Sequence, residues 1–139
     1  MKGLFILNSR EKRKTIKEIG VRYGLDEAEL KDMVLLIGEG FVWAAGRDCV
    51  ENLRSLPVSS LGIPIADEKK KEPTIHCIQL FFNNAWKRAV NLDRKQAEDF
   101  IDKKPVSLES ELSGRVLVKN EGRALDIGQL EDGILRRRS

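Results

Sequence analysis

Apolar residues near the start of the chain come first as a short run and then at helical spacing. The run over Gly3–Leu7 predicts a strand. Asn8 with Glu11 three residues later is the pattern of a capping box, so we expect a helix from here to the residue before Gly24. The apolar stripe that this helix should bury is Ile16, Ile19 and Tyr23.

The apolar segments that follow predict a hairpin. Asp26 is placed to cap a second short helix. The runs Met33–Ile37 and Phe41–Ala45 flank a glycine-rich turn, which is typical of two buried antiparallel strands. A short helical piece over Cys49–Leu56 follows and ends at Pro57, so we expect a compact α/β unit up to this point.

Residues 57–73 contain Gly62, three prolines and a charged run, a loop-like pattern, and we expect them to be a linker between two subdomains. One alternative stays open within this segment. Leu61, Ile63 and Ile65 alternate with Gly62 and Pro64, a pattern that also fits an edge strand.

The last part of the chain combines one well-marked helix with several strands. Periodicity does not distinguish helix from strand over Thr74–Phe82, whereas Lys87–Leu92 predicts a strand. Asp93 and Gln96 form a second capping box, and the helix that they start must end before Pro105. The apolar residues that we expect this helix to bury are Ala97, Phe100 and Ile101.

Two strands and a glycine turn follow this helix. Gly114–Lys119 and Ala124–Leu130 should pair as an antiparallel hairpin. Gly128 interrupts the second strand, which often marks a bulge or the close approach of another group. The sequence therefore predicts an α+β protein: a small N-terminal α/β unit over residues 1–56, a linker over 57–73, and a mixed β-barrel with short helices over 74–139.

Charge changes this picture because it is unevenly distributed. The 139 residues include 25 Lys and Arg against 22 Asp and Glu, a net charge of only +3. Residues 1–24 nevertheless hold seven basic and two acidic side chains, whereas residues 25–68 hold three basic and nine acidic ones. We therefore expect the basic segments, rather than the whole protein, to attract an anionic partner.

No combination of residues predicts catalysis, a metal site or a cofactor. His76 is the one histidine and lies beside Cys77, without a clear acid or base partner; an enzyme with a pocket around this pair is the least favoured of our hypotheses. Cys49 and Cys77 lack the spacing of a zinc site or a disulfide framework. The first apolar run is too short for a signal segment and no run is long enough to span a membrane, so we expect a cytoplasmic protein.

Three basic segments are candidates for contact with nucleic acid. They are the first helix, a lysine-rich loop and the arginines at the end of the sequence, and their side chains can neutralise phosphates. Phe82 and Trp86 flank a possible loop and could stack on bases, although we favour a place in the core for each. The residues that we expect to contact RNA are Lys69, Lys70, Lys71, Arg123, Arg136 and Arg137, followed by Lys14 and Lys17.

The order of several short motifs resembles a known RNA-binding module. Val90-Asn-Leu-Asp, Gly114-Arg-Val-Leu-Val, Gly122-Arg-Ala-Leu-Asp-Ile-Gly and Asp132-Gly-Ile-Leu-Arg are similar to the PUA-like domain at the C-terminus of the sun/Fmu and RsmF class of RNA cytosine-5 methyltransferases. Arg22-Tyr-Gly-Leu and Gly40-Phe-Val-Trp resemble the pre-PUA unit of those proteins, and Gly62-Ile-Pro-Ile their linking segment.

The resemblance implies RNA binding and does not extend to methylation. The methyltransferase core with its Pro-Cys nucleophile motif is missing from this sequence, and Arg136-Arg-Arg stands where the family has Lys-Asn. We therefore expect a protein that binds structured tRNA or rRNA and assists an RNA-modifying enzyme or ribosome assembly. The alternative is a protein–protein adaptor that does not contact RNA.

Overall fold

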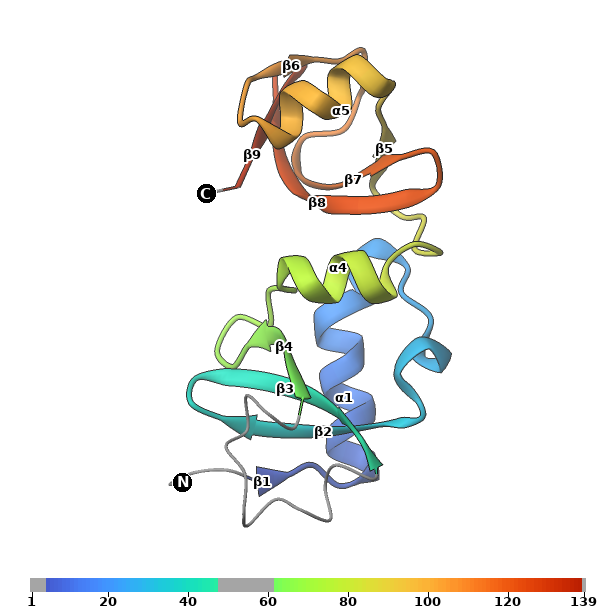
Figure 1. Cartoon of the computed structure of the whole chain (residues 1–139), viewed down its shortest axis with the longest axis vertical. Coiled ribbons are helices and arrows are strands. Elements are labelled where there is room, and N and C mark those ends of the chain that lie inside the picture. The colour runs from blue at the N-terminus through green and yellow to red at the C-terminus, as the bar shows by residue number, and fades with distance from the viewer. Residues whose placement is uncertain (1–4, 48–61, 139) are drawn as a thin grey trace. The chain divides into compact units, whose positions relative to one another are not determined.

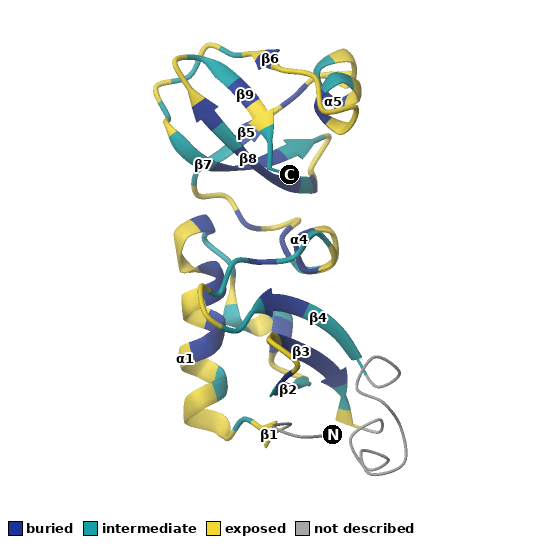
Figure 2. Cartoon of the chain, turned by 90° about the vertical axis from the view of Figure 1, so that its left-hand side faces the viewer, coloured by how far each residue is buried: buried dark blue, intermediate teal, exposed yellow. Residues whose placement is uncertain are grey.

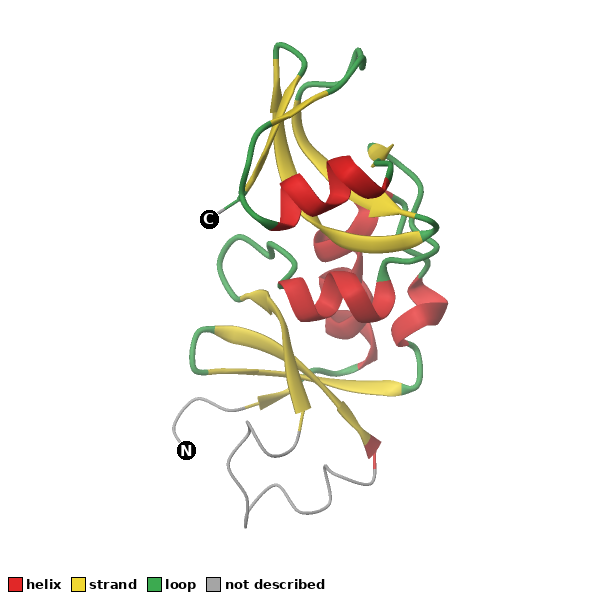
Figure 3. Ribbon diagram, turned by 45° about the horizontal axis from the view of Figure 1, so that its top comes forward, coloured by secondary structure: helices red, strands yellow, loops and turns green. Residues whose placement is uncertain are grey.

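The chain folds into two compact units, of mixed α+β class as the sequence predicts. The computed structural model describes residues 5–47 and 62–138. The first unit comprises Met1–Val21 with Leu25–Cys77, and the second comprises Arg22–Gly24 with Ile78–Ser139. Each unit contains one β-sheet, and the described residues form three α-helices and nine strands (Figures 1 and 3).

The sheet of the first unit has four strands in the order β1-β2-β3-β4, all antiparallel to their neighbours. The predicted hairpin is confirmed, since Met33 pairs with Gly46 and Gly38 with Phe41. The buried Trp43 donates its indole N–H to the carbonyl of Gly38 at 2.9 Å and so fixes the end of this hairpin. The strands are β1 (Phe5–Ile6), β2 (Met33–Gly38), β3 (Phe41–Gly46) and β4 (Gly62–Asp67).

Helix α1 (Ser9–Gly20) lies against this sheet and begins as the sequence predicts. The Asn8 side chain accepts the backbone N–H of Glu11 at 2.8 Å, and the Glu11 carboxylate accepts the backbone N–H of Asn8 at 3.0 Å. The helix ends before Val21, and a 3-10 turn, η1 (Val21–Tyr23), follows it. A second 3-10 turn, η2 (Glu27–Leu30), is capped by Asp26 as predicted. Figure 2 shows exposed residues along α1 alternating with the buried ones, which are Thr15, Ile16, Ile19 and Gly20.

The expected linker over residues 57–73 is not a linker in its described part. Residues 62–67 form β4, which pairs with β3, so the alternation of Ile63 and Ile65 marked a strand. The division between the two units falls within α4 (Ile75–Phe81), the segment for which periodicity gave no answer. Gly62 and Pro64 made this segment resemble a loop. Proline is tolerated in β4 because this strand lies at the edge of the sheet. The predicted helical piece over Cys49–Leu56 lies outside the described residues.

The sheet of the second unit has five strands in the order β5-β7-β8-β9-β6 and curls into a half-barrel. At one edge of this sheet β5 runs parallel to β7, a pairing that was not predicted from the sequence. The two-residue strand β6, which pairs with β9 at the other edge, was not predicted. The strands are β5 (Ala89–Asn91), β6 (Val106–Ser107), β7 (Gly114–Asn120), β8 (Arg123–Glu131) and β9 (Ile134–Arg137).

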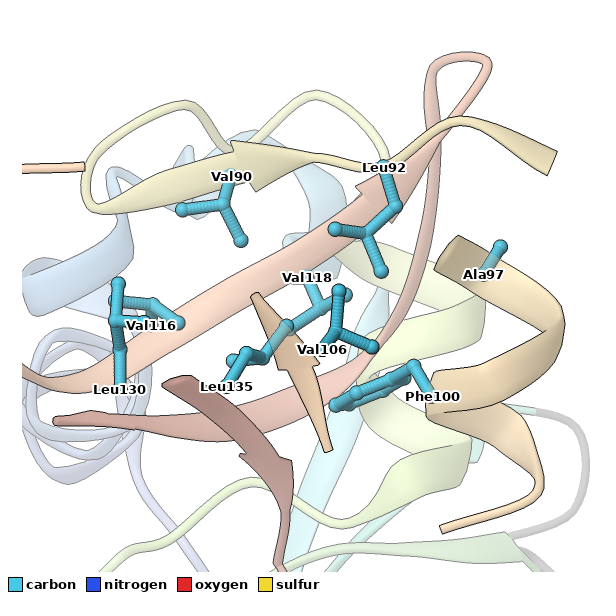
Figure 4. Close-up of a cluster of buried hydrophobic side chains, with 9 residues drawn as sticks. All are labelled: Val90, Leu92, Ala97, Phe100, Val106, Val116, Val118, Leu130 and Leu135. Carbon is cyan, nitrogen blue, oxygen red and sulfur yellow. The ribbon is translucent and has the colours of Figure 1, made fainter. Parts of the chain in front are cut away.

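Helix α5 (Arg94–Ile101) covers the concave side of this sheet. Its predicted capping box is confirmed, since the Asp93 carboxylate accepts the N–H of Gln96 at 2.8 Å and Gln96 accepts the N–H of Asp93 at 3.0 Å. Ala97 and Phe100 are buried as expected, but Ile101 is half exposed because the helix ends there. Figure 4 shows the resulting core, which consists of Val90, Leu92, Ala97, Phe100, Val106, Val116, Val118, Leu130 and Leu135.

Gly128 allows β7, β8 and β9 to pack closely. It continues the strand rather than interrupting it, and pairs with Val116 and with Arg137. A Cβ atom at Gly128 would lie 2.7 Å from Leu135 Cδ1 and 3.1 Å from Val118 Cγ2. The predicted close approach is therefore confirmed, and the irregularity in pairing occurs elsewhere, between Val118 and Lys119.

We expect Gly128→Ala to destabilise the protein by about 1–3 kcal/mol, because the added methyl group overpacks a core that is already filled. Gly46→Ala is the matched control, since a Cβ at this strand position meets nothing within 4 Å. The control should change the free energy of unfolding by less than about 0.5 kcal/mol. Urea unfolding followed by circular dichroism measures both, and equal stability of the two variants would contradict this packing argument.

Candidate nucleic-acid interface

Basic side chains gather around a hollow beside the start of α1. The hollow has a volume of about 440 Å³ and contains four cations, Lys12, Arg13, Lys31 and Arg47, against the single carboxylate of Glu27. Ser9, Ile16 and Ala28 complete its wall. The hollow thus combines room for a small group with an excess of positive charge.

A second hollow on α1 is basic as well. It is lined by Arg10, Arg13, Lys14, Lys17 and Glu18, so Arg13 belongs to both hollows. Lys17 also forms a long ion pair of 3.9 Å with Glu27, and both side chains are well exposed. Such a pair contributes little to stability and leaves Lys17 able to contact a partner. We call the residues of the two hollows the α1 basic surface, and its seven cations are Arg10, Lys12, Arg13, Lys14, Lys17, Lys31 and Arg47.

The positive charges of this surface are not balanced locally. Partial burial and the nearby positive charge of Arg47 lower the pKa of the Lys12 amine, and Asp32 offsets only part of this effect. The Lys12 amine donates a hydrogen bond to the carbonyl of Lys31 at 2.7 Å, which holds it at the rim of the hollow. Because an anion between Lys12 and Arg47 would relieve their repulsion, the hollow is suited to a phosphate.

The predicted residues Lys69, Lys70 and Lys71 lie in a tight turn that Asp67 organises. The Asp67 carboxylate accepts the backbone N–H of Lys70 at 2.7 Å and that of Glu72 at 2.8 Å. Lys71 has a positive φ of 58°, and its amine donates to the carbonyl of Glu68. Lys69 and Lys70 are exposed, so the turn presents two of the three lysines to solvent.

Arg123 belongs to the second unit. It is exposed at the start of β8 and lines a hollow of about 350 Å³ with Gln79, Asn83, Ala124 and Leu125. The Asn83 side chain accepts the backbone N–H of Ala124 at 2.8 Å, which ties the wall of the hollow to the strand. Arg123 is the one charged side chain of this hollow.

The arginines at the end of β9 have different surroundings. Arg136 is exposed, whereas Arg137 forms an ion pair of 3.3 Å with the buried Asp126 and donates to the carbonyl of Ile101 at 2.9 Å. Arg138 contacts the same carboxylate at 2.8 Å. Of the two predicted RNA contacts here, Arg136 is thus presented to solvent and Arg137 is held in a structural ion pair.

Of the residues that we expected to contact RNA, Lys14 and Lys17 lie together on the α1 basic surface. Several cations that we did not predict lie on the same surface. Arg10 and Arg13 share their helical face, a spacing that was readable from the sequence. Lys31 and Arg47 are remote in sequence, and only the fold places them beside Lys12. Arg123 of β8 pairs with Asn120 of β7, and Arg136 of β9 pairs with Gln129 of β8. Arg123 and Arg136 therefore lie toward opposite ends of β8.

Within residues 5–47 and 62–138, no group of three or more His, Cys, Asp or Glu side chains is arranged to hold a metal ion. His76 is exposed and Cys77 is buried, so the two side chains do not share one environment. None of the described helices has the length and apolar character needed to cross a membrane.

We expect Arg137→Ala to lower the free energy of unfolding by about 1–3 kcal/mol, because it removes a charged hydrogen-bond partner from the buried Asp126. Arg136→Ala removes the neighbouring exposed arginine and should change stability by less than about 0.5 kcal/mol. Urea unfolding of the two variants measures this difference. A loss of stability in Arg136→Ala equal to that in Arg137→Ala would contradict the structural role of Arg137.

We also expect the Asp67 turn to respond to acid. Partial burial raises the pKa of Asp67, but the hydrogen bonds from the backbone N–H groups of Lys70 and Glu72 outweigh it and hold the pKa below its ordinary value of 3.8. A carboxyl with a lowered folded-state pKa stabilises the fold above its unfolded-state value, and this contribution disappears as the pH falls through the folded-state value. Melting temperatures measured from neutral pH to below 3.8 should therefore fall less steeply for Asp67→Asn than for the wild type.

Comparison with known proteins adds no assignment to these surfaces. No protein-family model matches the sequence, and no curated protein matches it. A function is therefore inferred from the α1 basic surface and from the exposed arginines of the second unit.

Proposed function

We propose that this protein binds structured RNA, such as tRNA or rRNA, and that the α1 basic surface is its principal contact. The observation that carries this proposal is the grouping of seven cations around two adjoining hollows, in which Glu18 and Glu27 are the only carboxylates among the described lining residues. A regularly charged polyanion matches such a surface better than a small neutral ligand does, because several phosphates can be contacted at once.

The physical basis of binding is the neutralisation of phosphates. Each lysine or arginine that approaches a phosphate releases condensed counterions, which supplies affinity that falls as salt rises. Partial burial and repulsion from Arg47 lower the pKa of Lys12, and a phosphate held between these two side chains offsets that repulsion. These contacts give affinity and orientation, and they do not by themselves read the RNA sequence.

The exposed residues Lys69, Lys70, Arg123 and Arg136 supply further phosphate contacts in this proposal. The resemblance of the sequence to PUA-like domains agrees with it, and supports a cytoplasmic accessory role in RNA modification or ribosome biogenesis. We propose no catalytic step.

Filter binding to total tRNA and to rRNA at increasing salt tests the proposal. Arg13→Ala, which affects both hollows, should weaken binding to both RNAs and reduce the slope of log affinity against log salt by roughly 1, as the loss of one phosphate contact requires. The wild-type protein should bind at low salt. Absence of that binding, or an Arg13→Ala variant that binds like the wild type, would refute the proposal.

Arg94→Ala is the matched control for this experiment. Arg94 is a highly exposed arginine on helix α5 that pairs with Glu98 at 3.4 Å, and its removal lowers the net charge by the same amount. If binding depends on net charge alone, the two variants weaken it equally. If binding depends on the α1 basic surface, Arg94→Ala keeps the wild-type affinity and salt slope.

The second candidate is a protein–protein adaptor, which one observation favours. Phe5 and Ile6 are exposed on β1, an edge strand whose outer side has no neighbouring strand among the described residues. An apolar edge of this kind can accept a strand from a partner. Affinity capture with and without ribonuclease separates the candidates, since an adaptor keeps its partners after RNA is digested.

A further inference from the structure

Trp86 stands out in the second unit because a large aromatic side chain is left outside the core. Its exposed fraction is 69%, whereas the other tryptophan, Trp43, is exposed by only 7%. The neighbouring Phe82 and Ala85 are buried. The expectation that both Phe82 and Trp86 fit the core is therefore correct for Phe82 and wrong for Trp86.

The backbone that carries Trp86 is firmly held. The N–H groups of Trp86 and Lys87 both donate to the carbonyl of Tyr23 at 3.0 Å. Tyr23 itself is buried, with its ring centroid 5.9 Å from that of Phe82. The indole is thus attached to the core through its backbone while most of its ring faces solvent.

Lys119 of β7 holds the loop before Trp86 through two hydrogen bonds. The Lys119 amine donates to the carbonyl of Asn83 at 2.7 Å and to that of Ala85 at 3.1 Å. An aromatic group on such a fixed loop loses little conformational freedom when it contacts a ligand. The position of the Trp86 backbone is therefore set before any partner arrives.

The immediate surroundings of the indole combine a close backbone with positive charge. A Cβ at Gly24 would lie 3.1 Å from the indole nitrogen, so the absence of a side chain there makes room for the ring. The amine of Lys87 lies 5.4 Å from the centre of the Trp86 ring. The segments 22–24 and 83–91 contain Arg22, Lys87 and Arg88 and no acidic residue.

We propose that Trp86 is a stacking site for an unpaired base of RNA, with Lys87 placed to contact an adjacent phosphate. Exposed aromatic rings bind unpaired bases of any sequence by stacking, and a neighbouring lysine accommodates the backbone charge. This inference rests on the proposed RNA binding and deepens it, since it identifies single-stranded segments or loops as part of the target. Base pairs inside a duplex cannot use the site, because both of their faces are already stacked on neighbouring pairs.

The test compares a short single-stranded oligoadenylate with a blunt RNA duplex of the same length. Trp86→Ala should weaken binding of the oligoadenylate about 5- to 100-fold, the usual range for loss of one aromatic–base stack, and change duplex affinity less than about twofold. Trp86→Phe keeps an aromatic ring and should retain most of the affinity. Circular dichroism checks that both variants are folded, as expected for an exposed position.

Fluorescence provides an independent readout. Oligoadenylate should quench the tryptophan emission of the wild-type protein, and this quenching should disappear in Trp86→Phe although the RNA still binds. The two tryptophans differ so strongly in exposure that this comparison isolates the signal of Trp86.

The possible failures are distinguishable. If Arg13→Ala weakens binding of both RNAs while Trp86→Ala weakens neither, the stacking site is refuted and the proposed RNA-binding function stands. If neither RNA binds the wild-type protein, both proposals fail. If Trp86→Ala abolishes self-association and leaves RNA binding unchanged, Trp86 belongs to a protein contact and the stacking site is refuted.

Discussion

The two-sided geometry of helix α1 is the constraint on which the proposed binding surface depends. The capping box of Asn8 and Glu11 fixes where the helix begins, and burial of Ile16 and Ile19 then fixes its rotation against the sheet. At the other end, the N–H of Leu25 donates to the carbonyl of Gly20, and a Cβ at Gly20 would lie 2.4 Å from that of Leu25. With both ends and the buried side defined, the cations of the helix must share the remaining faces.

The second unit depends on a different constraint, the placement of β8 between two neighbours. Gly128, Gln129 and Leu130 of this strand pair with β7 on one side and β9 on the other, so they must suit both. Gly128 meets this demand by having no side chain, and the buried Asp126, which pairs with β7, binds Arg137 of β9 and the following Arg138. A buried carboxylate without such partners would be strongly destabilising, so the same arginines that add positive charge also complete the fold.

The features that were predictable from the sequence are those set by residues close together in the chain. Both capping boxes lie within three residues, and the hairpin of β2 and β3 is joined by a short turn, so local chemistry was sufficient to find them. The α+β class followed from these elements. β5 pairs in parallel with β7, and Arg47 lines the same hollow as Lys12. Both arrangements depend on contacts between segments that are distant in the chain, which no local sequence pattern encodes. For the same reason the sequence did not separate the exposed Trp86 from the buried Phe82, or Arg136 from Arg137.

The arrangement of the second sheet also has a consequence for the order in which it can assemble. β7, β8 and β9 follow one another in the chain and pair through tight turns, for example from Asn120 to Arg123. β5 pairs with β7 across the whole of α5 and β6, with Val90 opposite Val118. Closing that longer loop costs more entropy, and distant pairings form more slowly than local ones. We therefore expect the three-stranded meander of β7, β8 and β9 to form first. The two short outer strands, β5 and β6, then pair with it and complete the half-barrel.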